Sequence, residues 1–378
     1  MKYSISTITK VIILVLLTVG CNNTNTDKAE TITKTPLETE SYSMEDFKSL
    51  PKIDVHAHIN SDGKTMITEA RANNFKLLVM AVDVVDAYPP MEEQIRVRVK
   101  HHQEEPDVFA YTTAFTLQGW DEPDWTKKVI EKLAKDFENG ALGVKVWKNI
   151  GMVEKDKDGK LIMLDDPKFD PIFKYIKDQN KVLLSHAGEP KNCWLPIEEM
   201  TVNNDRDYFS KNPKYHMYNF PEMPSYEDQI RARNNMLEKN RDLTFVAVHL
   251  ASLEWSVDEI ASFLDNFPNA SVDLAERIGH LQVQSQIDRN KVRDFMIKYQ
   301  DRIVYGTDFS EDKDSDEILL RARMNKRWME DWKYLNTDET MEVSQLNTPF
   351  QGLRLPKSVV DKIYYGNANK IFPNAWKE

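Results

Sequence analysis

The sequence contains few cysteines. Only Cys21 and Cys193 occur among its 378 residues, which is too few for the disulfide framework of a small secreted domain. Cys193 stands beside Trp194 in a loop-like stretch, and we do not expect a catalytic thiol there.

Positive charge is also scarce. The 50 basic residues are outnumbered by 61 acidic ones, giving a formal net charge of -11, and no cluster of Lys and Arg marks a phosphate-binding track. We therefore expect no nucleic acid partner. The hydrophobic content of 41% and charged content of 29% are those of a folded globular protein, and the length allows one or two domains.

Long apolar runs are missing apart from one near the N-terminus. The run Val11–Val19 follows a basic start and is too short to span a bilayer, which predicts a secretory signal over residues 1–20. Its end, Leu17–Cys21, resembles a bacterial lipobox, although Thr18 stands where Leu is more usual. The resemblance implies that Cys21 is lipidated and becomes the mature N-terminus. An ordinary signal peptide is the alternative.

Two expectations follow for the N-terminal part of the chain. A lipid on Cys21 would anchor an exported protein to the membrane of the bacterial cell envelope, at the periplasmic face or the outer membrane. Residues 21–44 are rich in Thr, Asn, Glu and Lys and nearly free of apolar side chains, so they predict a flexible tether. The folded domain then covers residues 45–378.

The rest of the chain alternates short apolar strands with amphipathic helical stretches, a pattern of parallel βα units. Eight such units fit a closed (β/α)8 TIM-like barrel. An open doubly wound sheet would normally show a Gly-rich phosphate loop after its first strand, and none is present. A long insertion near residues 189–223 carries many aromatic side chains, which either form a lid or pack the loop onto the barrel. The expected strands are Lys52–Ile59, Phe75–Val82, Val108–Phe115, Gly143–Trp147, Val182–His186, Leu243–His249, Ala270–Leu274 and Ile303–Asp308.

Potential metal ligands stand at the ends of several expected strands. His56 and His58 are two residues apart on the first strand and project from the same face. His186, His249 and Asp308 close or follow three other strands. In a barrel of this kind the C-terminal strand ends meet at one mouth, so the sequence predicts a metal site there, most suited to Zn²⁺ with an open position for water.

These motifs together resemble the amidohydrolase superfamily, specifically its amidohydrolase-related (amidohydrolase 2) branch. The resemblance implies a metal held by His56, His58, His186 and Asp308. It also implies that Asp308 accepts a proton from the attacking water and that His249 acts as an acid/base or electrophilic residue. The matching segments are Asp54–His58, Gly143–Lys145, Ser185–His186, His249, Tyr305–Asp308 and Tyr365–Ala368.

Lys145, late in the fourth strand, has two interpretations. In binuclear relatives a lysine at this place is carbamylated and bridges two metals, so a second metal is expected only if Lys145 is carbamylated. Otherwise its amine is free to bind a substrate carboxylate. Strand alternation places Lys145 and Trp147 on one face, as substrate-binding candidates, and Lys148 on the other.

Other polar residues are expected to have structural roles or to allow more than one interpretation. Arg277, just after the seventh strand, either clamps an anionic substrate group or forms a structural salt bridge. His280 is expected at the surface or behind the site, and the pair His101–His102 is expected to be solvated in a polar helix.

The leading hypothesis is a metal-dependent hydrolase of a small ester, lactone or amide, with a small molecule as its partner. The alternative is a metal-dependent, non-oxidative decarboxylase of an aromatic or unsaturated acid, because the same branch contains such enzymes. Export favours hydrolysis, since decarboxylases of catabolic intermediates normally work in the cytoplasm. A third hypothesis is a surface-anchored solute-binding protein, against which the intact ligand set argues.

Overall fold

The computed structural model describes residues 40–84 and 88–377. The expected signal, the lipidation site Cys21 and the tether up to residue 39 lie outside the described residues and stay predictions. Among the helices that the structure does describe, none combines the length and apolar character needed to cross a membrane.

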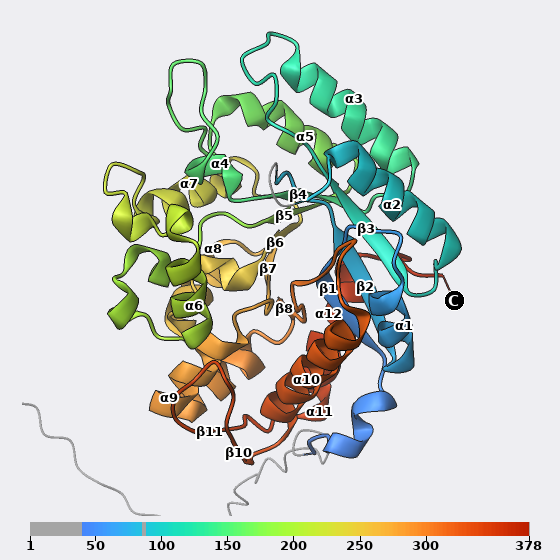
Figure 1. Cartoon of the computed structure of the whole chain (residues 1–378), viewed down its shortest axis with the longest axis vertical. Helices are drawn as coiled ribbons and strands as arrows, with labels where there is room; N and C mark the ends of the chain where they lie inside the picture. The colour runs from blue at the N-terminus through green and yellow to red at the C-terminus, as the bar shows by residue number, and fades with distance from the viewer. Residues whose placement is uncertain (1–39, 85–87, 378) are drawn as a thin grey trace, which may run out of the picture. The chain divides into compact units, whose positions relative to one another are not determined.

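A single parallel sheet forms the centre of the described domain (Figure 1). Its order is β8-β7-β6-β5-β4-β3-β2-β1-β9, so the strands from β1 to β8 each pair with their neighbours in the chain, as βα units require, and β9 pairs with β1. The strands are β1 (Lys52–Ile59), β2 (Phe75–Met80), β3 (Phe109–Ala114), β4 (Gly143–Val146), β5 (Val182–Ser185), β6 (Phe245–Ala247), β7 (Ala270–Asp273), β8 (Ile303–Val304) and β9 (Phe309–Glu311); β10 (Thr340–Met341) and β11 (Phe350–Gln351) form a separate ribbon.

Residues 303–311 close the sheet into a barrel. Their first part, β8, pairs with β7, and their last part, β9, pairs with β1. Between them the backbone N–H of Val55 donates to Tyr305 O at 3.0 Å, and that of Asp308 donates to His56 O at 2.7 Å. The expected TIM-like barrel is therefore confirmed. The eighth strand is not continuous as expected, because Asp308 adopts φ 66° and interrupts it.

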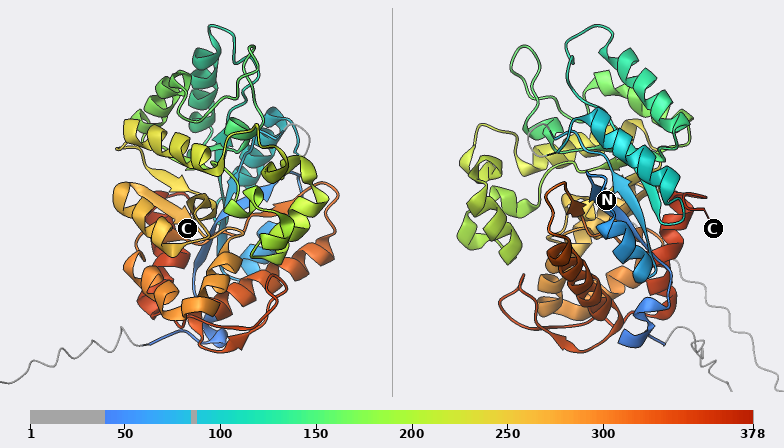
Figure 2. Two further views of the ribbon diagram at one scale, coloured as in Figure 1. Left: turned by 90° about the vertical axis from the view of Figure 1, so that its left-hand side faces the viewer. Right: turned by 45° about the vertical axis from the view of Figure 1, so that its right-hand side comes forward.

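Helices cover the outside of the sheet, and Figure 2 shows α6, in yellow-green, at the edge of the domain. The apolar positions of α5 at Ile172, Phe173 and Ile176 recur at helical spacing and are buried. The helices are α1 (Thr65–Ala72), α2 (Met91–Glu104), α3 (Trp125–Glu138), α4 (Asn149–Met152), α5 (Asp170–Asp178), α6 (Asn203–Lys211), α7 (Tyr226–Lys239), α8 (Val257–Asn266), α9 (Ile278–Lys298), α10 (Glu317–Asn336), α11 (Lys357–Asp361) and α12 (Asn367–Ile371).

The two faces of the sheet carry two apolar layers. The outer face packs against the helices in the larger cluster. The inner face fills the barrel with aliphatic side chains such as Val55, Leu184 and Val246, which meet Phe372 and Trp376 of the C-terminal segment. Since polar residues close this inner layer at the carboxyl ends of the strands, the sheet itself positions the candidate site.

A register shift in β1 decides which residues face inward. The pairing of β1 with β2 is irregular between Asp54 and Ala57, which is the effect of a β-bulge. Ile53 and Val55 belong to the inner layer before it, whereas Ala57 and Ile59 belong to the outer layer after it. The shift therefore turns both His56 and His58 toward the barrel interior above Val55.

Candidate metal centre

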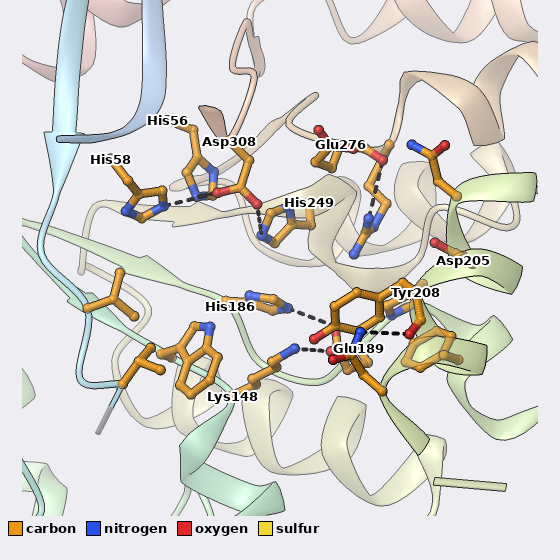
Figure 3. Close-up of a pocket in the computed structure, with 18 of the residues that line it drawn as sticks. His56, His58, Lys148, His186, Glu189, Asp205, Tyr208, His249, Glu276 and Asp308 are labelled. Carbon is orange, nitrogen blue, oxygen red and sulfur yellow. Dashed lines mark hydrogen bonds and ion pairs between the residues drawn. The ribbon is translucent and has the colours of Figure 1, made fainter. Parts of the chain in front are cut away.

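The polar residues at the strand ends line one cavity of about 610 Å³. Figure 3 shows His56, His58, His249 and Asp308 together on one side of it. Lys145, Trp147, His186 and Arg277 also line the cavity. All the site residues expected from the sequence within the described domain thus face the same space, and the distances between them distinguish two groups.

The first group consists of three imidazoles around one carboxylate. Asp308 Oδ1 lies 3.2 Å from His56 Nε2 and 3.0 Å from His58 Nε2. Asp308 Oδ2 lies 3.8 Å from His249 Nε2. The ligand atoms of His56, His249 and Asp308 all lie within 4.8 Å of one another, close enough to hold one metal ion.

Each imidazole is oriented by an acceptor at its other nitrogen. His56 Nδ1 lies 2.7 Å from Asp273 Oδ2, His58 Nδ1 lies 3.1 Å from Met80 O and His249 Nδ1 lies 2.9 Å from Ala275 O. These oxygens can only accept, so a ring that donates from Nδ1 keeps its Nε2 lone pair free, which is the tautomer that a metal ligand needs. The three Nε2 atoms all face Asp308.

The charges of these groups agree with that arrangement. Burial lowers the pKa of His58 and, together with His186, holds the pKa of His249 well below its usual value. Burial alone would raise the pKa of Asp308, but the imidazoles of His56, His58 and His249 outweigh it and hold that pKa well below its usual value. The carboxylate is thus ionised, and at least two of the rings facing it are neutral.

A nitrogen lone pair and a carboxylate oxygen that face each other at about hydrogen-bond distance repel, unless a proton or a metal cation lies between the two atoms. Imidazole nitrogen and carboxylate oxygen are the ligand types of divalent zinc, iron and manganese sites. The convergence of three imidazole Nε2 atoms on one carboxylate, with an acceptor behind each ring at Nδ1, shows that these residues fit a divalent metal.

The backbone carrying these side chains is unusual at two places. Gly306 lies next to His56, and a Cβ on it would stand 2.9 Å from the Cβ of His56, so only glycine allows this close approach. The residues of η8 (His249–Ser252) all have positive φ, between 53° and 61°. Left-handed backbone costs roughly 1–2 kcal/mol per non-glycine residue, and strain of this kind gathers at functional sites.

Asp273 is the functional residue that the sequence analysis missed. It is fully buried at the end of β7. Its Oδ2 accepts from His56 Nδ1, and its Oδ1 accepts from the backbone N–H of His249 at 2.6 Å and that of Ala275 at 3.2 Å. One carboxylate therefore fixes an imidazole on β1 and the start of the left-handed turn after β6. The sequence signal that could have identified Asp273 is its place near the end of the expected seventh strand.

The second group is an ion-pair chain formed by His186, Glu189 and Lys148. His186 Nε2 lies 3.4 Å from Glu189 Oε2, too poorly aligned for a hydrogen bond, and Lys148 Nζ contacts Glu189 Oε1. Burial lowers the pKa of His186 to about 4. Figure 3 shows His186 between the two groups. Its ring packs against that of His249 with centroids 4.2 Å apart, and its expected role as a metal ligand stays a prediction.

The fourth strand differs from expectation at its end. The prediction that Lys148 faces away from Lys145 and Trp147 is wrong, because all three line the cavity. Strand β4 ends at Val146, so the alternation does not reach Lys148. Lys145 Nζ lies 3.5 Å from His56 Nε2, and burial lowers its pKa to about 8. A carbamylated Lys145 and a second metal stay predictions.

The inserted loop supplies part of the cavity wall and also packs against α7, and its expected role as a lid stays a prediction. Tyr208 and Phe209 line the cavity, whereas Trp194 packs edge-on against Tyr226 outside it. Cys193 is buried in the loop's own apolar cluster.

One of the remaining histidines is more buried than expected, and His280 lies behind the site, one of its two expected places. The expectation that the pair His101–His102 is solvated is wrong, because His101 is fully buried and its Nε2 lies 3.0 Å from Ser61 O. His280 is also buried, behind the cavity wall, where its Nε2 lies 3.2 Å from Asp205 Oδ2.

A parallel barrel with an imidazole–carboxylate cluster at the carboxyl ends of its strands defines a class of TIM-barrel enzymes. The family model described as amidohydrolase matches residues 53–373, nearly the whole described domain. The chain belongs to the amidohydrolase family, whose members typically bind divalent metals. No curated protein matches its sequence.

Two solved structures illustrate the shared fold. An uncharacterized TIM-barrel protein from Bordetella bronchiseptica is 14% identical, with 86% of this chain and 99% of that chain covered and a TM-score of 0.51. A 2,6-dihydroxybenzoate decarboxylase from Rhizobium is also 14% identical, with 85% and 98% covered and a TM-score of 0.51. At this identity the likeness concerns the fold alone.

Proposed function

We propose that the protein is a metal-dependent hydrolase that cleaves a small ester, lactone or amide with water. The observation that carries the proposal is the convergence of three imidazole Nε2 atoms on the ionised Asp308 carboxylate. We assign the metal, proposed to be one Zn²⁺, to His56, His58 and Asp308. Either His186 or His249 completes the site, and the other stays free.

A bound divalent metal supplies Lewis acidity, which lowers the pKa of water toward neutrality and polarises a carbonyl group. The chain's own residues handle the protons. Asp308 is ionised and partly open to the cavity, so it accepts a proton from water. Where His186 is the fourth ligand, His249 is free, and with its Nδ1 donating to Ala275 O its Nε2 can take up a proton and return it to the leaving group.

The second candidate is a decarboxylase of an aromatic or unsaturated acid. It is favoured by the likeness in fold to the 2,6-dihydroxybenzoate decarboxylase. The proposed signal over residues 1–20 and lipid on Cys21 favour hydrolysis instead, because an anchored, exported enzyme meets its substrates outside the cytoplasm. Residues 21–44 would then link the lipid to the enzyme domain.

The test is a panel of esters, lactones, amides and aromatic acids assayed in ¹⁸O-labelled water. The hydrolase proposal predicts that ¹⁸O enters the carboxylic acid product and that Asp308→Asn removes turnover while ligand binding survives. Release of CO₂ together with a product that has lost its carboxyl group would establish the decarboxylase. Ligand binding without turnover in either assay would leave a solute-binding protein.

A further inference from the structure

The acidic residues that line the cavity each contact a basic side chain other than Arg277. The pairs are Asp207 with Lys211 at 3.0 Å, Asp205 with His280 at 3.2 Å, Glu276 with Arg327 at 3.5 Å, Glu189 with Lys148, and Asp308 with the imidazoles of the first group. The cavity therefore offers no spare carboxylate among its described lining residues. Its basic side chains differ in whether they contact a carboxylate.

Arg277 is a buried cavity cation with donors that no described residue uses. It is 8% exposed, and within residues 40–84 and 88–377 no carboxylate oxygen comes within 4.0 Å of its guanidinium. Within the same residues its single hydrogen bond goes from Nη1 to the backbone O of Glu276 at 3.2 Å, and its Nε is buried without a partner. Burial alone would lower the pKa of Arg277, but the carboxylates of Asp205 and Glu254 outweigh it, so the guanidinium stays charged. A buried donor without a partner is costly, so a bound anion that accepts from Nε–H would stabilise the site.

The unused part of the guanidinium has the shape of a carboxylate receptor. Nε–H and one Nη2–H lie on the same edge of the planar group and point in parallel, which is the geometry of a two-pronged arginine–carboxylate pair. Neither donates to a described residue. The fold fixes the backbone of this residue at the cavity wall, because Arg277 immediately precedes α9 and its backbone N–H donates to Leu274 O at 3.1 Å.

Arg277 also lies at a useful place relative to the metal centre. It lines the same cavity as His249 and Asp308, and it is close enough for its positive charge to contribute to the low pKa of His249. Glu276, its neighbour in sequence, lies beyond His249 on the side of the cavity away from His58 (Figure 3). A substrate held at Arg277 can therefore extend toward the metal centre.

We propose that Arg277 binds a carboxylate of the substrate through its Nε–Nη2 edge, so that the enzyme acts on esters, lactones or amides that carry a free carboxylate. This inference rests on the proposed function and specifies its substrate class. The carboxylate at Arg277 is not the group that reacts. It orients the molecule, and the scissile bond lies at the metal centre.

Binding of benzoate and of its uncharged isostere benzamide to the full chain tests the proposal by calorimetry. Wild-type protein is expected to bind benzoate more tightly than benzamide. Arg277→Met is expected to weaken benzoate binding about 10- to 100-fold, the worth of a charge-assisted pair, and to leave benzamide binding unchanged. Arg277→Lys keeps the charge but not the fork, and is expected to recover part of the loss. Lys211→Met, which removes an exposed and paired cavity cation, is the matched control and is expected to bind like wild type.

Benzoate could instead bind a metal, so the series is repeated with His56→Ala/His58→Ala. Retained binding in this variant supports Arg277 as the receptor even if hydrolysis is lost, which separates the failure of this inference from that of the proposed function. Equal affinities for benzoate and benzamide in wild type overturn the proposal. Benzoate binding that survives in Arg277→Met also overturns it, as does tighter binding of inorganic phosphate than of benzoate. If Arg277→Met does not fold, the proposal is tested by the benzoate affinity of Arg277→Lys and by the comparison of benzoate with benzamide in wild type.

Discussion

Replacing Asp273 by Asn removes one oxygen from a buried carboxylate whose two oxygens are both in use. Oδ2 accepts from His56 Nδ1, and Oδ1 accepts from the backbone N–H groups of His249 and Ala275. An amide of the same shape has one acceptor and one donor group, so whichever way it turns, an N–H faces an N–H. The substitution therefore tests the orientation of the metal centre with little change in volume.

Two magnitudes follow for Asp273→Asn. Leaving a buried donor unsatisfied costs roughly 1–3 kcal/mol, so the free energy of unfolding should fall by about that amount. Loss of the group that orients a metal-binding imidazole typically costs 10- to 100-fold in metal affinity, or about 1.4–2.7 kcal/mol. Chelator competition measures the metal affinity, and urea unfolding of the metal-free protein measures the stability.

Asp136→Asn is the matched control for this prediction. Asp136 is also buried, and its Oδ2 bonds Thr113 Oγ1 and pairs with Lys132, but it does not line the cavity. Its replacement should lower the stability and leave the metal affinity unchanged. A metal affinity of Asp273→Asn equal to that of wild type would refute the reasoning, whatever happened to its stability.

Three further substitutions test other parts of the structure. Glu189→Gln leaves Lys148 buried without its counter-ion, and unfolding experiments should show a loss of roughly 3–5 kcal/mol; a loss below about 1 kcal/mol would contradict the ion-pair account. Burial raises the pKa of Asp331 from 3.8 to about 7. Between these two pH values the folded state keeps a proton on Asp331 that the unfolded state releases. This group therefore lowers the free energy of unfolding as the pH rises from 4 to 7, by at most roughly 4 kcal/mol. Asp331→Asn should flatten that part of the pH–stability curve, and an unchanged curve would refute the assignment. A Cβ at residue 143 would stand 2.4 Å from Val182 O, so Gly143→Ala should separate β4 from β5 and lower the melting temperature. Gly366→Ala is the control, because its φ is -61° and a Cβ there makes only an ordinary contact of 3.6 Å with Asp361 O; an equal effect of both substitutions would contradict the clash.

The barrel was predictable because its signals are local. Each strand is a short apolar run followed by a helix with its own periodicity, and parallel βα units allow few arrangements. The break of the eighth strand was not predictable in this way. It depends on the backbone of Asp308 turning to positive φ, a choice stabilised by the hydrogen bond from its N–H to His56 O on a distant strand.

The cavity-lining residues were likewise predicted by their places at strand ends, whereas their partners were not. Asp273 looks like any polar residue ending a strand until the fold brings it against His56. Lys148 was placed on the wrong face because period-2 alternation holds only while the strand lasts. His101 looked solvated because its helix is rich in charge, although that position of α2 faces the barrel. Such contacts join residues far apart in the chain.

The central claim is that His56, His58 and Asp308 hold a divalent metal. The most direct test is metal content by elemental analysis of the purified protein, beside His56→Ala/His58→Ala, His186→Ala, His249→Ala and Lys145→Ala. We expect about one equivalent of zinc. It should be lost in the double variant, and also in either His186→Ala or His249→Ala, depending on which of these two histidines is the remaining ligand. About two equivalents, reduced in Lys145→Ala, would show a binuclear centre. Wild-type protein that holds no metal after reloading would contradict the account.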